Sequence, residues 1–285
     1  MDRIWRKRHT AVLAGCVLVF CFSHGALAEV ETVDGVEWTY VVADGQASVG
    51  GGKDAGGHCI PAVPLSTTGD LAIPAALGGH PVTGIGNHAF DGCAGLTGLA
   101  IPDSVRTIGF YAFFNCHGLT EMILPEKLDT IGVAAFRQCT GLAGISIPDG
   151  VPEIGFATFL GCTGLANVTI GNGVTNIGDE AFWDCRALKS VAIPDSVKSI
   201  GYGAFHGCSG LTNAIIGANV SHIHPHAFDG CDGLAAVPVA TKAPDPPDFS
   251  CLAFHPLWDL AFPPIFESLG FFRSNVPPAC PLGSD

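Results

Sequence analysis

The chain has 285 residues, of which only 14% are charged, and its mean hydropathy is +0.40. This apolar composition excludes an intrinsically disordered chain, and the 38 glycines and 20 prolines indicate many turns. The formal net charge of −13 argues against nucleic acid and anionic membrane surfaces as partners.

The N-terminal segment, Met1 to Ala28, has the three parts of a secretory signal peptide. Four bases lie within residues 3–8, residues 11–22 are apolar, and Ala26-Leu27-Ala28 resembles a cleavage site. About twelve apolar residues are too few for a transmembrane helix, which needs roughly 20. We therefore predict cleavage after Ala28, no transmembrane segment in the mature chain, and a secreted or cell-surface location.

Two alternatives to cleavage after Ala28 stay open. Leu13-Ala14-Gly15-Cys16 resembles a bacterial lipobox, in which the cysteine would carry lipid. Residues 17–22 remain apolar, however, where a lipoprotein usually becomes polar. An uncleaved N-terminal anchor is the second alternative.

Residues 29–72 are predicted to form an N-terminal cap. Asp44-Gly45 lies between two apolar-rich segments, residues 36–42 and 46–49, which is a strong signal for a β-hairpin. A hairpin here would cover the open edge of the domain that follows, and exposed strand edges invite aggregation.

A 23-residue repeat fills the middle of the chain. Residues 101–123 read IPDSVRTIGFYAFFNCHGLTEMI, and residues 193–215 read IPDSVKSIGYGAFHGCSGLTNAI. A motif of the form Ala-Phe-x-x-Cys marks seven units without an insertion. Its phenylalanines are Phe90, Phe113, Phe136, Phe159, Phe182, Phe205 and Phe228, and its cysteines are Cys93, Cys116, Cys139, Cys162, Cys185, Cys208 and Cys231. The period predicts a solenoid.

Each unit also contains the L-x-x-L-x-L core of a leucine-rich repeat, as in Leu96-x-x-Leu99-x-Ile101. The alternation of apolar and small residues predicts a half-buried strand, and Pro102-Asp103 predicts the turn after it. A second short strand at residues 105–108 should precede a short helical turn at residues 112–116. Stacked units then give an α/β-type solenoid with a parallel sheet over residues 73–239.

The repeat resembles the BspA-like leucine-rich repeat family, whose pattern is I-P-x-x-V-x-x-I-G-x-x-A-F-x-x-C-x-x-L-x-x-V. The resemblance covers about residues 73–239. It implies a leucine-rich repeat solenoid in a secreted or surface protein, of a kind associated with adhesion to host proteins or to other cells.

Residues 240–285 form a Pro/Phe-rich tail without a further Ala-Phe-x-x-Cys motif. A C-terminal cap, a linker and an atypical end are all compatible with this composition. The tail holds Cys251 and Cys280, and a disulfide bridge between them stays open.

The seven repeated cysteines are predicted to be reduced. Their number is odd, each has the same inward position, and a free cysteine behaves as a small buried apolar residue. Cysteines that recur only once per repeat also provide no C-x-x-C pair for a metal.

Two patterns suggest metal ligands, but both have simpler explanations. His222, His224 and His226 alternate as they would on one strand face, yet Pro225 breaks that strand. The acids Asp103, Glu126, Asp149 and Asp195 share one repeat position, where turn preference already explains them and calcium is the alternative. We predict no metal site and no cofactor.

The outward strand positions, among them Thr97, Thr120 and Ile123, are on the whole small, neutral and hydroxyl-rich. Aromatic residues gather instead around the predicted helical turn. These candidate binding residues are Phe110, Tyr111, Phe114, Phe156, Trp183 and Tyr202. They form an adhesive patch if they are exposed together, and the alternative is that they pack along the flank of the solenoid.

The sequence contains no motif of a known catalytic site, so we predict that the protein is not an enzyme. The favoured function is an adhesin-like, non-catalytic binding scaffold that contacts an extracellular protein or glycan through one solenoid face. The alternative is a structural, self-associating component of the cell envelope or matrix. A metal-dependent enzyme at the histidine triplet is a third and weaker hypothesis.

Overall fold

A computed structural model describes residues 28–54 and 57–236 of the chain. The chain divides into two units, Met1–Ala243 and Pro244–Asp285, and the described residues all belong to the first. The predicted signal peptide, Cys16, and the tail with Cys251 and Cys280 lie outside the described residues. Among residues 28–54 and 57–236, no helix is long and apolar enough to cross a membrane.

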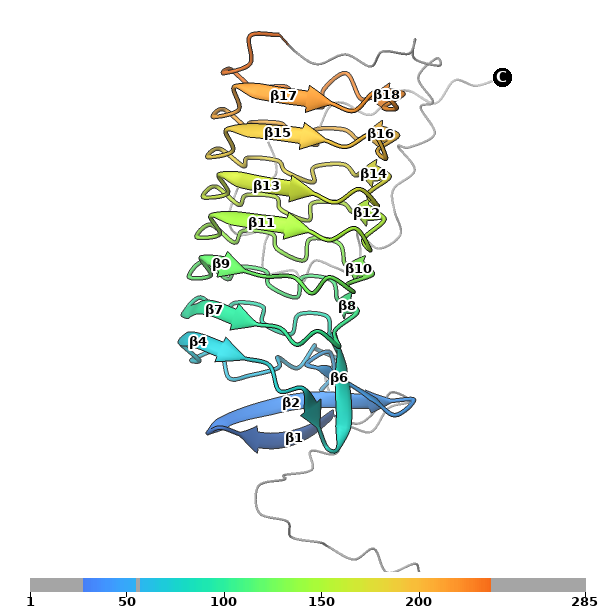
Figure 1. The fold of residues 1–285 in the computed structure, drawn as a ribbon. Coiled ribbons are helices and arrows are strands. Elements are labelled where there is room, and N and C mark those ends of the chain that lie inside the picture. The colour runs from blue at the N-terminus through green and yellow to red at the C-terminus, as the bar shows by residue number, and fades with distance from the viewer. Residues whose placement is uncertain (1–27, 55–56, 237–285) are drawn as a thin grey trace, which may run out of the picture. The chain divides into compact units, whose positions relative to one another are not determined.

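The repeats form a parallel β-solenoid of seven rungs, each rung contributing one strand to each of two ladders (Figure 1). The A ladder contains β4 (Gly69–Ala72), β7 (Leu96–Ala100), β9 (Glu121–Met122), β11 (Gly144–Ile147), β13 (Asn167–Ile170), β15 (Ser190–Ile193) and β17 (Asn213–Ile216). The B ladder contains β6 (His80–Ile85), β8 (Thr107–Ile108), β10 (Thr130–Ile131), β12 (Glu153–Ile154), β14 (Asn176–Ile177), β16 (Ser199–Ile200) and β18 (His222–Ile223).

Most neighbouring strands in each ladder pair in parallel at the spacing that the sequence predicts. The strand pairing is interrupted between β13 and β15 in the A ladder and between β10 and β12 in the B ladder. Ile145 lies opposite Val168 and Thr107 lies opposite Thr130, and the members of each pair are one repeat length apart in the sequence. The predicted solenoid and its period are therefore confirmed. The first A strand begins at Gly69, slightly before the expected start of the repeats at Ile73.

The core consists of columns of identical residues that run along the solenoid. The seven repeated phenylalanines stack nearly parallel, with adjacent ring centroids 5.0 to 5.3 Å apart. The seven repeated cysteines are buried beside them as free thiols, as predicted. The fourth rung departs from the motif, since Thr158 replaces alanine; its buried hydroxyl donates to the Gly155 carbonyl at 2.9 Å.

The prediction that the Ala-Phe-x-x-Cys segments are helical was wrong, and no helix occurs in the described residues. The Phe113 amide donates to the Ala135 carbonyl of the next rung at 2.7 Å, rather than to a carbonyl of its own preceding turn. Tyr111 and Asn115 have φ values of 53° and 59°, which are left-handed and interrupt a right-handed helix. Consecutive turns therefore form the third side of the solenoid, which we call the turn flank.

Three antiparallel strands cap the N-terminal end (Figure 1). They are β1 (Ala28–Val33), β2 (Val36–Ala43) and β3 (Gln46–Val49). The β2–β3 hairpin confirms the prediction from Asp44-Gly45, because both residues have the positive φ of a type I′ turn. Strand β3 then pairs in parallel with β6, so the hairpin covers the edge of the B ladder. A short strand, β5 (Ala76–Leu77), pairs with β6.

Candidate binding surfaces

The predicted aromatic residues all lie on the turn flank, but they do not form one patch. Tyr111 and Phe114 meet edge to face, with ring centroids 5.6 Å apart. The His88 ring stacks on Tyr111 at 5.1 Å, and the Arg137 guanidinium lies 5.8 Å from the centre of the Phe114 ring. We call His88, Tyr111 and Phe114 the first aromatic cluster.

A second aromatic cluster covers the last three rungs of the turn flank and contains Trp183, Tyr202, His206, His224 and His226. Trp183 stacks on His206 with ring centroids 3.9 Å apart, and its centroid lies 6.3 Å from that of Tyr202. Tyr202, which is 43% exposed, meets the edges of His224 and His226 at 5.1 and 6.0 Å. The rings therefore support one another at the surface.

The backbone beneath the second cluster leaves space for the Trp183 indole ring. Gly203 has a φ of +56°, and a Cβ atom on it would lie 2.7 Å from the Trp183 ring. A glycine here lets the Trp183 ring lie directly on the turn of the next rung. The same repeat position holds Tyr111, Ala134 and Ala157 in earlier rungs.

Phe110 and Phe156 stand apart from both clusters, without a ring contact to another aromatic residue in the part of the chain that is described. Phe110 is 47% exposed and Phe156 is half-buried. The sequence reasoning missed the histidines as members of the clusters. Their register was available, because His206 follows Trp183 by one repeat length and His88 precedes Tyr111 by the same interval.

Within the second cluster, the surroundings of His224 favour its neutral form. Burial and the neighbouring His226 lower the pKa of His224 below its usual value. His226 contacts the Asp229 carboxylate at 2.8 Å, but both side chains are about half exposed, so this contact adds little stability. The stacked Trp183 and His206 rings and the neighbouring Tyr202 give a partner a mainly aromatic contact surface.

The structure does not bring metal ligands together in residues 28–54 and 57–236, where no group of three His, Cys, Asp or Glu side chains could hold an ion. Two of the four acids for which calcium was the alternative explanation have a structural role. Asp149 accepts the Asn172 amide at 2.7 Å, and Asp195 accepts the Ala218 amide at 2.6 Å. Each carboxylate thus stabilises the stacking of one rung on the next.

The pKa is raised for five of the seven repeated cysteines, whereas a hydrogen bond with Cys208 lowers the pKa of Cys231 at the end of the column. Burial raises the pKa of Cys93 to about 11, and it raises the pKa values of Cys116 and Cys139 as well. A thiol that stays protonated is a poor nucleophile and a poor metal ligand at neutral pH. These residues therefore serve the core.

A groove of about 950 Å³ crosses the outer face of the A ladder over β4, β7 and β9. Its lining includes Ile123, which is 86% exposed. The lining also includes four acids, Asp70, Asp103, Glu121 and Glu126, and one base, Lys127. The expectation of a small and neutral strand face is wrong for these rungs, because the acids of the following turns join the strand residues.

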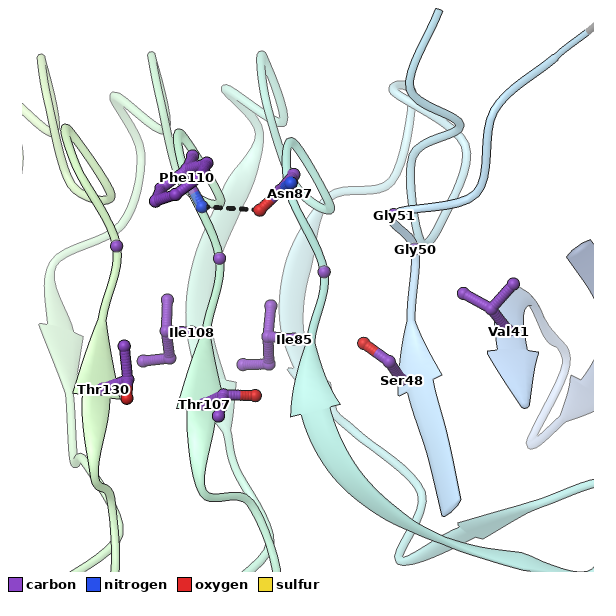
Figure 2. Close-up of a pocket in the computed structure, with 13 residues that line it drawn as sticks. Val41, Ser48, Gly50, Gly51, Ile85, Asn87, Thr107, Ile108, Phe110 and Thr130 are labelled. Atoms are coloured by element: carbon purple, nitrogen blue, oxygen red, sulfur yellow. Dashed lines mark hydrogen bonds between the residues drawn. The ribbon is translucent and has the colours of Figure 1, made fainter. Parts of the chain in front are cut away.

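A smaller pocket of about 370 Å³ lies on the B ladder near the N-terminal cap. Figure 2 shows the hydroxyl-bearing side chains Ser48, Thr107 and Thr130 on one side of it and Phe110 on the other. Asn87 accepts the Phe110 amide at 2.8 Å. Backbone at several glycines, including Gly86, Gly109 and Gly132, lies between these two sides, and the lining has no charged residue.

Comparison with known proteins agrees with this architecture. A model of the BspA type leucine rich repeat region matches in six copies over residues 83–209 and 135–243. No protein with a curated description matches the sequence.

Two solved structures are similar to the chain. A leucine rich repeat protein of T. pallidum has 32% sequence identity and a TM-score of 0.61, covering 69% of this chain and 87% of its own. A leucine-rich repeat protein from Eubacterium ventriosum has 21% identity and a TM-score of 0.60, covering 75% of this chain and 52% of its own, and it supports the fold alone. The chain thus belongs to the BspA-type leucine-rich repeat family.

Proposed function

We propose that the protein is a non-catalytic, adhesin-like binding scaffold that contacts an extracellular protein or glycan through its turn flank. The observation that carries this proposal is the second aromatic cluster, in which Trp183 stacks on His206 and lies beside Tyr202, with ring centroids 3.9 and 6.3 Å apart. The core does not use these rings, since Phe182 and Phe205 of the same rungs fill the interior column.

The chemistry of the cluster supports contact with a partner. Tryptophan and tyrosine supply large, rigid contact areas and are enriched where proteins bind other molecules. The three rungs that carry the rings are held in register by backbone bonds, such as that from the Phe182 amide to the Ala204 carbonyl at 2.7 Å. The surface is therefore preorganised, which reduces the entropy lost on binding.

The family and the residues together support a scaffold rather than an enzyme. Repeat arrays of this kind bury their apolar residues between rungs and present extended surfaces. A secreted or cell-surface location is part of the proposal, and it rests on the pattern of residues 1–28 and on the resemblance to secreted repeat proteins.

A binding array tests the proposal. The purified protein is applied to immobilised extracellular matrix proteins and glycans, beside the double variant Trp183→Ala, Tyr202→Ala and the control Phe156→Ala, which changes a lone ring on the same flank. We expect the double variant to weaken binding by about tenfold or more, and the control to leave it nearly unchanged. Equal binding by all three proteins would contradict the proposal.

The same proteins distinguish the proposed binding function from the alternative, self-association. Sedimentation of the wild type over a range of concentrations would then show oligomers that the double variant loses, together with no binding on the array. This result would favour a structural role in the envelope or matrix.

A further inference from the structure

From the groove on the A ladder we infer a second binding surface, one that takes an extended, basic and aliphatic peptide segment of a partner protein. The groove lies on the strand face, whereas the aromatic clusters lie on the turn flank. The inference therefore goes beyond the proposed function and stands independently of it.

The apolar part of this surface is centred on Ile123. Its neighbours at the same repeat position are Ala100 and Ser146, which are both small. The side chain of Ile123, which is 86% exposed, therefore projects further from the strand face than the side chains on either side of it. Single exposed apolar residues are common on proteins. Ile123, however, lies in a groove of about 950 Å³ that also includes the partly exposed Leu71 and Ile101. An aliphatic side chain of a partner can pack in this space.

The charged residues of the surface determine which charge a partner must carry. Asp103, Glu121 and Glu126 have no ion-pair partner in the described part of the chain. Lys127 is the one base in the lining. Opposed charges guide encounter and reject partners of the wrong sign, so lysine or arginine side chains fit this groove.

The polar groups on the floor favour a peptide over a glycan. The Thr97 hydroxyl donates to the Asp70 carboxylate at 2.7 Å, and the Thr120 hydroxyl donates to the Thr97 carbonyl at 3.2 Å. Both hydroxyls are therefore engaged within the protein. What remains free for a ligand is a set of carboxylates around an aliphatic side chain, and a basic, aliphatic segment complements both features.

Three synthetic peptides of equal length probe the groove: alternating lysine and leucine, glutamate and leucine, and lysine and serine. Fluorescence anisotropy measures their binding to the full protein at about 0.01 M and about 0.15 M salt, where the Debye length falls from about 30 to about 8 Å. We expect the lysine–leucine peptide alone to bind tightly, and to bind at least about tenfold more weakly at the higher salt concentration.

Two variants locate the binding on the chain. Ile123→Ser and the pair Glu121→Gln, Glu126→Gln should each weaken binding about tenfold. Ile215→Ser is the matched control, because Ile215 occupies the same repeat position, is 60% exposed and lies outside the groove. Thermal unfolding checks that all variants fold. Trp183→Ala should leave peptide binding unchanged, which separates this inference from the proposed function.

Several outcomes would overturn the inference. These are an equal loss of binding in Ile215→Ser, equal binding of the glutamate–leucine peptide, or no binding of the lysine–leucine peptide. A homodimer that Ile123→Ser dissociates would assign the groove to a second copy of the chain, and this too would overturn it.

Discussion

The Cys139 thiol donates a hydrogen bond to the backbone carbonyl of Phe113 in the preceding rung, with 3.0 Å between sulfur and oxygen. The same carbonyl accepts the Cys116 amide at 3.2 Å, so both of its lone pairs are used inside the core. Five further cysteines make the equivalent contact along the column. The repeated cysteine is thus a small apolar residue that also satisfies a buried acceptor.

Cys139→Ala should lower the free energy of unfolding by about 1–2 kcal/mol, because it removes the thiol contact and leaves a small cavity. Urea unfolding measures the change. The control is Cys59→Ala, which alters a half-buried cysteine outside the column and should change stability by less than about 0.5 kcal/mol. Equal losses in the two variants would contradict a special role for the column.

The seven repeated cysteines should react with a thiol reagent only after unfolding. Counting thiols in the native and the urea-unfolded protein without reductant should give a difference of at least seven, since all seven are buried and reduced. A smaller difference, restored by reductant, would show disulfides between rungs.

The buried thiols whose pKa is raised, such as Cys93, make stability depend on pH in the alkaline range. Cys93, whose pKa rises from 9.0 to about 11 on folding, is protonated in both states below pH 9. Above this value the unfolded chain loses its proton first, so the contribution of Cys93 to stability falls as pH rises toward 11. Urea midpoints should be flat from about pH 7 to 8 and fall above about pH 9. A midpoint that rises with pH would contradict this assignment.

The period of the repeat was enough to predict the interior of the protein. Residues such as Phe136 and Cys139 recur once in every repeat, and stacking identical rungs leaves their side chains only one common direction, toward the core. The hairpin at Asp44-Gly45 could also be predicted, because its geometry depends on two adjacent residues.

Features that depend on contacts between rungs could not be predicted in the same way. Ala112-Phe113-x-x-Cys116 has the spacing of a helical turn, but the Phe113 amide bonds to Ala135, a partner in the next rung. The helical propensity of the segment gives no information about this bond between rungs. The acidic groove was missed for a related reason, since Glu126 reaches it from a turn rather than from a strand position.

The phenylalanine column should couple the two halves of the solenoid. Phe159→Ala removes a fully buried ring that stacks on Phe136 and Phe182, and should cost about 3–5 kcal/mol. Because rungs contact only their neighbours, unfolding should also broaden or separate into two steps. Phe156→Ala, on the turn flank of the same rung, should cost much less. Circular dichroism during urea unfolding compares the two, and similar losses would contradict the assignment of core and flank.

Close approach of successive rungs requires glycine after several of the B strands, including β8, β10 and β16. A Cβ atom at Gly132 would lie 2.6 Å from the carbonyl carbon of Gly109, which is backbone and has little room to move. Gly132→Ala should therefore destabilise the protein by about 1–3 kcal/mol through overpacking. At Gly144 the nearest atom would be 3.6 Å away, so Gly144→Ala should change stability by less than about 1 kcal/mol. Thermal unfolding of both variants measures the contrast, and a neutral Gly132→Ala would show that the rungs can separate at little cost.

The central claim is that the repeated positions build the fold while the irregular surface positions bind partners. A substitution library of the full protein, scored in parallel for protease resistance and for binding to the ligand found on the array, tests this division most directly. Changes at Phe159 and Cys139 should reduce protease resistance, whereas changes at Trp183 and Tyr202 should reduce binding and leave resistance intact. Loss of resistance at Trp183 and Tyr202, or unchanged binding when both are replaced, would contradict the account.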